Sequence, residues 1–173
     1  MTVFRAAAIL LALAGPAVAA PETGSSLRVL GSPTRQALIE ELEDWLDANT
    51  ELPRSAIPLV RVALIAAGDE VSYEGRLTRL EDTVRGLYDE ATATIYLVRP
   101  WSGDTAWDRS VLLHELVHHR QAAARHWYCP QAMEWDAYRI QESYLDAHGQ
   151  TGDFQWGWVL LVSSCASRDH HPD

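Results

Sequence analysis

The segment VLLHELVHHRQ, residues 111–121, carries three histidines and one glutamate within an otherwise apolar stretch. His114 and His118 are four residues apart, so on a helix both imidazoles project from one face at a spacing that suits a single zinc ion. Glu115 is rotated from that pair by about 100°, which keeps its carboxylate off the metal and beside the water that the metal would hold. These residue types and this spacing predict two metal ligands and a general base.

The HExxH pattern is too specific to be expected by chance in this chain. With 7 histidines and 12 glutamates among 173 residues, about 0.02 matches are expected. Zinc lowers the pKa of bound water from about 16 toward 7, so a neighbouring carboxylate can take its proton at neutral pH. The pattern therefore favours zinc-dependent hydrolysis over a histidine-bearing helix that only packs.

A third ligand must come from outside this segment, because catalytic zinc sites use three protein ligands and keep a fourth position open. The extended pattern with a third histidine needs Gly at 121 and His at 124, and this chain has Gln121 and Ala124. The best carboxylate is Glu134, on the next predicted helix, with Asp136 as a weaker alternative.

The HELVHH segment followed by Glu134-Trp135-Asp136-Ala137 resembles the gluzincin branch of the zinc metallopeptidases. The resemblance covers about residues 84–142 and implies that Glu134 completes a Zn²⁺ site with His114 and His118. It also implies peptide or protein substrates. Ala137-Tyr138 departs from the Ser/Ala-Asp of better-known members, so Asp136, Asp108 or a backbone carbonyl would have to orient the first histidine.

Two further side chains are candidates for roles near the metal. Tyr138 lies one turn beyond Glu134 and could donate to a developing oxyanion, although core packing with its hydroxyl at the rim is the alternative. His126 and Tyr128 are weaker alternatives for that donor. His119 rotates off the metal face and is expected to be solvated or to contact the ligands.

The elements that must position these residues predict an α+β, zincin-like single domain. It contains an N-terminal helix, a small sheet of three or four mostly antiparallel strands, the HExxH helix and a following helix with the third ligand. Ser32 is the predicted cap of the first helix, and Thr105, answered by Asp108, is the predicted cap of the HExxH helix. The tail after Gly149 favours a helix. The predicted helices are 33–48, 105–125 and 131–147, and the predicted strands lie near 58–65, 71–79, 84–88 and 93–98.

The resemblance carries one further expectation for the strand ATIYLV, residues 93–98. In zincin-like enzymes the strand before the active helix lies at a sheet edge, where an extended peptide can add by main-chain hydrogen bonds. The many tryptophans, in contrast, are expected to pack in the core and between helices rather than to form a substrate-binding wall.

Residues 1–19 form a predicted signal peptide, with a basic start at Arg5, an apolar run and a small-residue cleavage pattern. The apolar run is shorter than the roughly 20 residues of a membrane-spanning helix. Residues 20–173 are then a secreted or periplasmic domain. Cys129 and Cys165 are expected to form a disulfide there, which would contribute about 3–4 kcal/mol by loop entropy.

The formal net charge of −10 makes binding to negatively charged partners unfavourable. Loss of residues 1–19 removes one arginine and no acid, giving −10 − 1 = −11. A chain this acidic is not expected to bind nucleic acid or an anionic membrane surface. The sequence thus predicts an exported zinc metallopeptidase, with a non-catalytic zinc-binding or partner-binding module as the alternative.

Overall fold

The computed structural model describes residues 28–29, 33–58, 61–81 and 83–165. The predicted signal peptide, residues 1–19, and the predicted helix cap Ser32 lie outside these residues.

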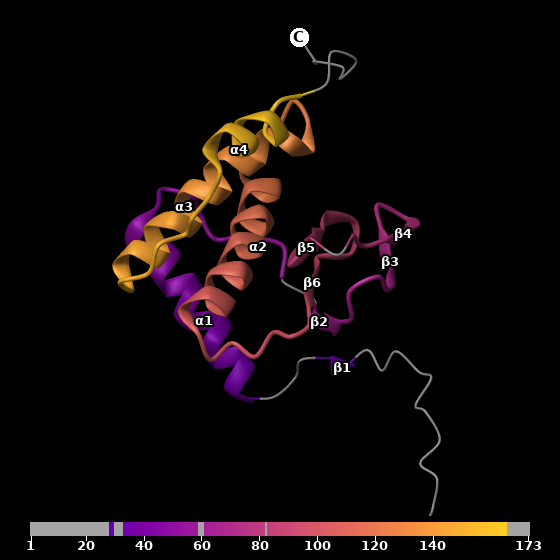
Figure 1. The fold of residues 1–173 in the computed structure, drawn as a ribbon, viewed down its shortest axis with the longest axis horizontal. Helices are drawn as coiled ribbons and strands as arrows, with labels where there is room; N and C mark the ends of the chain where they lie inside the picture. Colours follow the sequence, from indigo (N-terminus) through magenta and orange to yellow (C-terminus); the bar gives the residue numbers. More distant parts are fainter. Residues whose placement is uncertain (1–27, 30–32, 59–60, 82, 166–173) are drawn as a thin grey trace, which may run out of the picture.

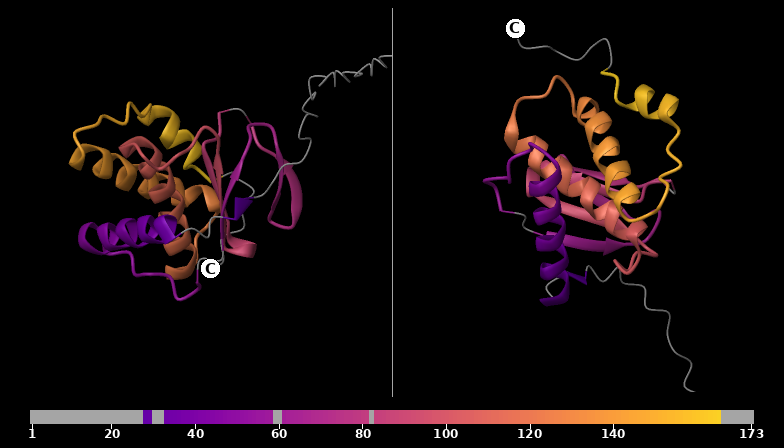
Figure 2. Two further views of the ribbon diagram at one scale, coloured as in Figure 1. Left: turned by 90° about the horizontal axis from the view of Figure 1, so that it is seen from below. Right: turned by 90° about the vertical axis from the view of Figure 1, so that its left-hand side faces the viewer.

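The described chain forms three layers (Figures 1 and 2): four helices, a four-stranded sheet and a two-stranded hairpin. The sheet has the order β1-β2-β6-β5, and the hairpin consists of β3 and β4. This arrangement confirms an α+β fold. The bounds are β1 Arg28–Val29, α1 Pro33–Asn49, β2 Arg61–Ile65, β3 Glu70–Tyr73, β4 Arg76–Arg79, β5 Gly86–Asp89, β6 Thr94–Val98, α2 Ala106–Ala124, α3 Glu134–Ala147 and α4 Trp156–Val162, with 3-10 turns at Glu90–Thr92 and Pro130–Met133.

Strand β6 is buried on both faces because it lies between the helical and hairpin layers. Successive side chains of a strand point to opposite faces. Ile95 and Leu97 therefore enter the core beneath the helices, while Tyr96 and Val98 enter the smaller core beneath the hairpin. An apolar run of five residues with little alternation is the expected sequence of such a strand.

The sheet differs from the predicted one in the placement of β6. This strand pairs in parallel with β2, from Arg61 opposite Thr94 to Ile65 opposite Val98, and antiparallel with β5. The sheet is therefore mixed, and β5 rather than β6 lies at its edge. The prediction that residues 93–98 form the edge strand was wrong.

The single strand predicted at 71–79 is instead the β3–β4 hairpin. Its turn is Glu74-Gly75, whose φ angles are +50° and +74°. Two consecutive positive φ angles match the right-handed twist of the flanking strands in a two-residue turn. Glycine adopts this conformation easily, but glutamate is uncommon at the first position of such a turn. The turn could therefore not be recognised in the sequence.

Helix α2, the HExxH helix, begins and runs almost as predicted. Thr105 caps it by accepting the backbone N–H of Asp108 at 3.0 Å. The Asp108 carboxylate does not answer that cap; it accepts instead from Ser102 Oγ at 2.9 Å and from the backbone N–H groups of Ser102 and Gly103. From Ser110 to Gln121 every residue of α2 is buried, because α1, α3 and the sheet surround it.

The remaining elements follow the predicted pattern with small changes. The third predicted helix begins with a 3-10 turn and becomes α-helical at Glu134. Gly149, just beyond its end, has the left-handed φ of +67° expected of a closing glycine. The tail forms the short helix α4, and the predicted Cys129–Cys165 disulfide is present.

Candidate metal centre

The structure brings together the side chains of His114 and His118 on α2 and of Glu134 at the start of α3. One ligand atom from each residue lies within 4.8 Å of the other two. The two imidazole Nε2 atoms are 3.1 Å apart, and the Glu134 oxygens lie 3.4 Å and 3.5 Å from them. A tetrahedral site with bonds of about 2.1 Å has ligand–ligand distances of about 3.4 Å. The three donors are therefore already spaced for one ion of zinc's size.

The tautomer of His118 is fixed by a hydrogen-bonded chain that ends on a backbone carbonyl. Gln121 Nε2 donates to the Met133 carbonyl oxygen at 3.0 Å, and this oxygen can only accept. Gln121 Oε1 must then face His118 Nδ1, 3.0 Å away, and it accepts a proton from that nitrogen. In the neutral ring the proton of His118 is therefore on Nδ1, and Nε2 points into the cluster.

His114 is oriented in the same way by a second chain. Ser110 Oγ donates its only proton to the Trp107 carbonyl at 2.8 Å, so it accepts from Gln141 Nε2 at 3.1 Å. Gln141 Oε1 therefore accepts from His114 Nδ1 at 3.0 Å. The neutral His114 ring is therefore the Nδ1–H tautomer as well. We call these two chains the glutamine relays.

The relays create a local conflict that a cation would resolve. When both rings are neutral, two imidazole nitrogens without protons face each other at 3.1 Å beside a carboxylate, with His114 and His118 both buried. Three electron-pair donors converging in a buried space repel one another unless an electron-pair acceptor lies between them. Their types, two imidazoles and one carboxylate, are the donor set of hydrolytic zinc sites. The residues present therefore fit the metal.

Glu115 lies beside this cluster, held by the edge strand of the sheet. Its carboxylate accepts the backbone N–H of Tyr88 in β5. A methyl group on Gly86 would lie 2.9 Å from Cδ of Glu115, so only glycine allows β5 to approach this closely. Burial raises the pKa of Glu115, and the negative charge of Glu134 adds to this rise.

The charge of Glu134 is governed by its two histidine neighbours. Burial alone would raise the pKa of the Glu134 carboxyl, but interactions with His114 and His118 outweigh it and hold this pKa far below its ordinary value. Burial lowers the pKa of His118, and the contact with Glu134 reverses that effect into a net rise. Glu134 is therefore an anion at neutral pH, as a metal ligand must be.

The predicted orienting carboxylates do not contact the histidines. Asp108 binds Ser102, and Asp136 forms a long ion pair of 3.9 Å with Arg125. Glutamine amides take their place, which the sequence analysis missed. A signal existed for both: Gln121 lies one turn after His118, and Gln141 lies two turns after Glu134 on the same face of α3.

Tyr138 and His119 have separate environments. The Tyr138 ring packs edge-on against His114, with ring centres 4.7 Å apart. Burial, together with the charges of Glu134 and Glu115, raises the Tyr138 pKa to about 12. His119 is buried and not solvated, and its Nδ1 lies 2.9 Å from the Tyr88 hydroxyl.

The cluster opens into a cleft of about 780 Å³. One side of the cleft is formed by the segment from Thr83 to Tyr88, which includes most of β5, and the other by residues of α3, α4 and the turn before α4. Arg85 accepts the N–H of Val98, so by the alternation of antiparallel pairing the outward backbone groups of β5 belong to Gly86 and Tyr88. Glu115 takes the Tyr88 N–H, and no described residue bonds to the outward N–H and C=O of Gly86.

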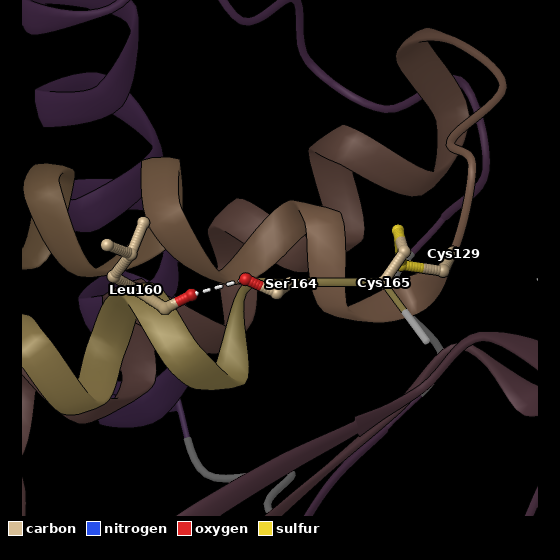
Figure 3. The surroundings of a disulfide bond; sticks show 4 residues. All are labelled: Cys129, Leu160, Ser164 and Cys165. Atoms are coloured by element: carbon tan, nitrogen blue, oxygen red, sulfur yellow. Dashed lines mark hydrogen bonds between the residues drawn. A yellow bond between two sulfur atoms is a disulfide. The ribbon is translucent and has the colours of Figure 1, made fainter. Parts of the chain in front are cut away.

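The disulfide joins two chain segments near the cluster of His114, His118 and Glu134, which we call the metal cluster (Figure 3). Cys129 precedes the 3-10 turn that leads into Glu134, and Cys165 follows the end of α4. Ser164 Oγ donates to the Leu160 carbonyl at 2.8 Å and closes the end of that helix. The bridge therefore connects α4 to the segment that carries the third ligand.

Fold and site together define an α+β domain with a two-histidine, one-glutamate cluster at the base of a cleft. The chain belongs to the family described as domain of unknown function DUF6647, whose sequence model matches residues 31–173. No curated protein and no solved structure matched the chain. Within the described residues, no helix is both long enough and apolar enough to span a bilayer.

Proposed function

We propose that this protein is an exported zinc-dependent metallopeptidase that hydrolyses peptide bonds. The observation that carries the proposal is the convergence of ligand atoms from His114, His118 and Glu134 beside the buried carboxylate of Glu115. A purely structural zinc site is usually closed by four protein ligands and has no use for a base. The disulfide supports an oxidising compartment, in agreement with the predicted signal peptide.

The roles of the residues follow from their positions. Zinc bound by His114, His118 and Glu134 would polarise the substrate carbonyl and acidify the attacking water. Glu115 takes the proton of that water and delivers it to the leaving amine, and its raised pKa suits both transfers. The hydroxyl of Tyr138 stays protonated at neutral pH, which makes it the candidate donor to the developing oxyanion.

A peptide substrate has a free strand edge to bind. The outward N–H and C=O of Gly86 in β5 are free to pair with an extended chain, which would then cross the metal cluster. This assigns the role predicted for residues 93–98 to β5, the strand that lies at the edge of the sheet. Main-chain pairing of this kind accounts for binding of peptides irrespective of much of their sequence.

The test compares the wild-type protein with the variant Glu115→Gln, both produced with the disulfide intact. Zinc content is measured by mass spectrometry, and cleavage is measured on casein and on a peptide mixture. We expect about one zinc per chain in both proteins and a loss of about 10²–10⁴-fold in turnover for the variant. The exposed Glu51→Gln serves as the matched control and should cleave like the wild type.

Three other outcomes would decide against the proposal. Wild-type protein without bound zinc would remove the metal site. Equal cleavage by Glu115→Gln and the wild type would remove Glu115 as the base. Zinc in both proteins with no cleavage by either would favour the non-catalytic zinc-binding module.

A further inference from the structure

A continuous series of aromatic rings leads away from the metal cluster. The ring of Tyr138, which contacts His114, lies 5.3 Å from the ring of Phe154 and 6.2 Å from that of Trp158. Trp107 stacks on the other side of Phe154 at 6.0 Å. All four aromatic residues line the cleft, and we call them the aromatic wall.

The aromatic wall presents apolar surface to the cleft rather than to the core. Trp107 is 41% exposed and Trp158 is 53% exposed, whereas the core residue Trp101 is 8% exposed. Adjacent exposed aromatic rings in a concave site are the usual mark of a ligand-binding surface. Trp107 and Trp158 therefore keep exposed ring surface in addition to the packing contacts that were expected of the tryptophans.

The local backbone is built to hold the rings in these positions. Asp153 has a left-handed φ of +49°, which folds the chain so that the Phe154 ring covers Gly152. A methyl group on Gly152 would overlap that ring, so the close approach requires glycine. Val159, 1% exposed, anchors α4 against the domain. The wall is thus a fixed surface, further restrained by the disulfide that follows α4.

The aromatic wall and β5 line the same cleft as His114, His118 and Glu134. Helix α2, which carries Trp107, contacts both β5 and α3, and α3 contacts α4, so α2 lies between β5 and α4 (Figure 1). Successive side chains of an extended peptide point to opposite faces, so a peptide paired with Gly86 and presenting its carbonyl to the cluster can place a neighbouring side chain on the wall. An aromatic or large aliphatic side chain would exclude water from these rings, while a charged one would lose its hydration.

We propose that the aromatic wall is a substrate subsite that binds a bulky apolar side chain, so that the protein selects peptide bonds flanked by an aromatic or large aliphatic residue. This proposal rests on the proposed peptidase function. It identifies the class of substrate that the function alone leaves open.

The test uses acetylated hexapeptides on an alanine background, carrying Phe, Leu, Ala or Asp at each of the four central positions. The zinc-loaded wild-type protein should cleave the best Phe or Leu peptide at least about tenfold more efficiently than the Ala peptide. Phe154→Ala and Trp158→Ala should remove this preference mainly through KM, without changing zinc content. Leu160→Ala is the control, since Leu160 lies on the same helix, is 60% exposed and does not line the cleft.

A binding measurement separates failure of the subsite from failure of the peptidase function. The same peptides are titrated calorimetrically into zinc-loaded Glu115→Gln, where Phe peptides should bind at least about tenfold more tightly than the alanine peptide. Preference in binding with no cleavage by the wild type would support the aromatic wall and overturn the peptidase function. Cleavage without any side-chain preference, or a preference that survives both wall variants, would overturn the subsite.

Discussion

The two glutamine relays fix which ring nitrogen of each histidine faces the candidate metal site. Each relay ends on a backbone carbonyl, which cannot donate, so the direction of every hydrogen bond along it is set. Glutamine is neutral, and it therefore orients the imidazole without adding negative charge behind it. A zinc ion held here would keep more of its positive charge for the substrate than one backed by carboxylates.

Loss of one relay should weaken metal binding without unfolding the protein. In Gln141→Leu, His114 Nδ1–H loses its acceptor and the ring loses its fixed tautomer. We expect the zinc dissociation constant to rise about 10–100-fold, measured by competition with a chelator. Nitrogen NMR of the metal-free wild type should show the Nδ1–H tautomer at both His114 and His118. The exposed neighbour variant Ser143→Ala should match the wild type, and an unchanged dissociation constant in Gln141→Leu would contradict the relay.

Gly86 should control the position of the Glu115 carboxylate without affecting zinc binding. The side chain added in Gly86→Ala would collide with the Glu115 carboxylate and displace it from the cluster. We expect turnover to fall about 10²-fold with zinc content unchanged, because a shift of about 1 Å in a reacting group costs that much. Gly157→Ala, whose added methyl group meets no atom within 4 Å, is the matched control. Full activity in Gly86→Ala would show that β5 does not position the base.

The three converging side chains of the candidate metal site could be predicted from the sequence because they obey local rules. His114 and His118 share a helix, and Glu134 opens the next helix at a spacing typical of the family that the sequence resembles. The glutamine partners obey helical spacing too, but glutamine is uncharged, so its residue type did not mark it as a partner of the histidines. Only the packing of α2 against α3 shows that Gln141 reaches His114, 27 residues away.

At the scale of elements, a buried arginine, Arg120, fastens the HExxH helix to α1, in addition to the more exposed Arg109–Glu41 ion pair. Arg120 is fully buried and donates to the Glu43 carboxylate, to the Glu43 backbone carbonyl at 2.8 Å and to the Leu52 carbonyl at 2.8 Å. It also lies 2.8 Å from Asp47. A buried guanidinium with every donor directed at an oxygen fixes the angle between two helices as well as their distance.

Replacing that arginine should cost much of the stability of the domain. In Arg120→Met the partly buried Glu43 carboxylate loses its partner and the other acceptors of the guanidinium are left unpaired, so we expect the free energy of unfolding to fall by about 3 kcal/mol, measured by urea denaturation. Arg125→Met is the control just beyond the end of the same helix, because its ion pair with Asp136 is exposed and long. That variant should lose less than about 1 kcal/mol. Equal losses in the two variants would show that the Arg120 contacts contribute no more than a surface pair.

Helix ends could be predicted because local sequence signals mark them. Strand order could be predicted less well, because it depends on which strands pair in the sheet. The cap at Thr105 and the closing glycine at 149 placed two helices within a few residues. Strand order has no local signal: β6 could have been an edge, and only its parallel pairing with β2 puts it inside the sheet. The turn at Glu74-Gly75 was missed because its first residue is not one of the usual turn formers.

At the scale of the whole molecule, the metal cluster links the two helices that enclose the larger core. His114 and His118 come from α2 and Glu134 from α3, and α2 also packs on the sheet. A ligand that binds only the folded chain stabilises it in proportion to the logarithm of its concentration over its dissociation constant. Zinc should therefore stabilise the entire domain.

Thermal unfolding with and without zinc measures this coupling. At a free zinc concentration of 100 times the dissociation constant, the free energy of unfolding should rise by about 2.7 kcal/mol. For a domain of this size that corresponds to an increase in Tm of about 5–10 °C, which EDTA should abolish. His118→Ala should show no response to zinc, while the exposed His126→Ala should respond like the wild type. A zinc response that persists in His118→Ala would place the stabilising ion elsewhere, because a site that has lost one of three ligands cannot retain such affinity.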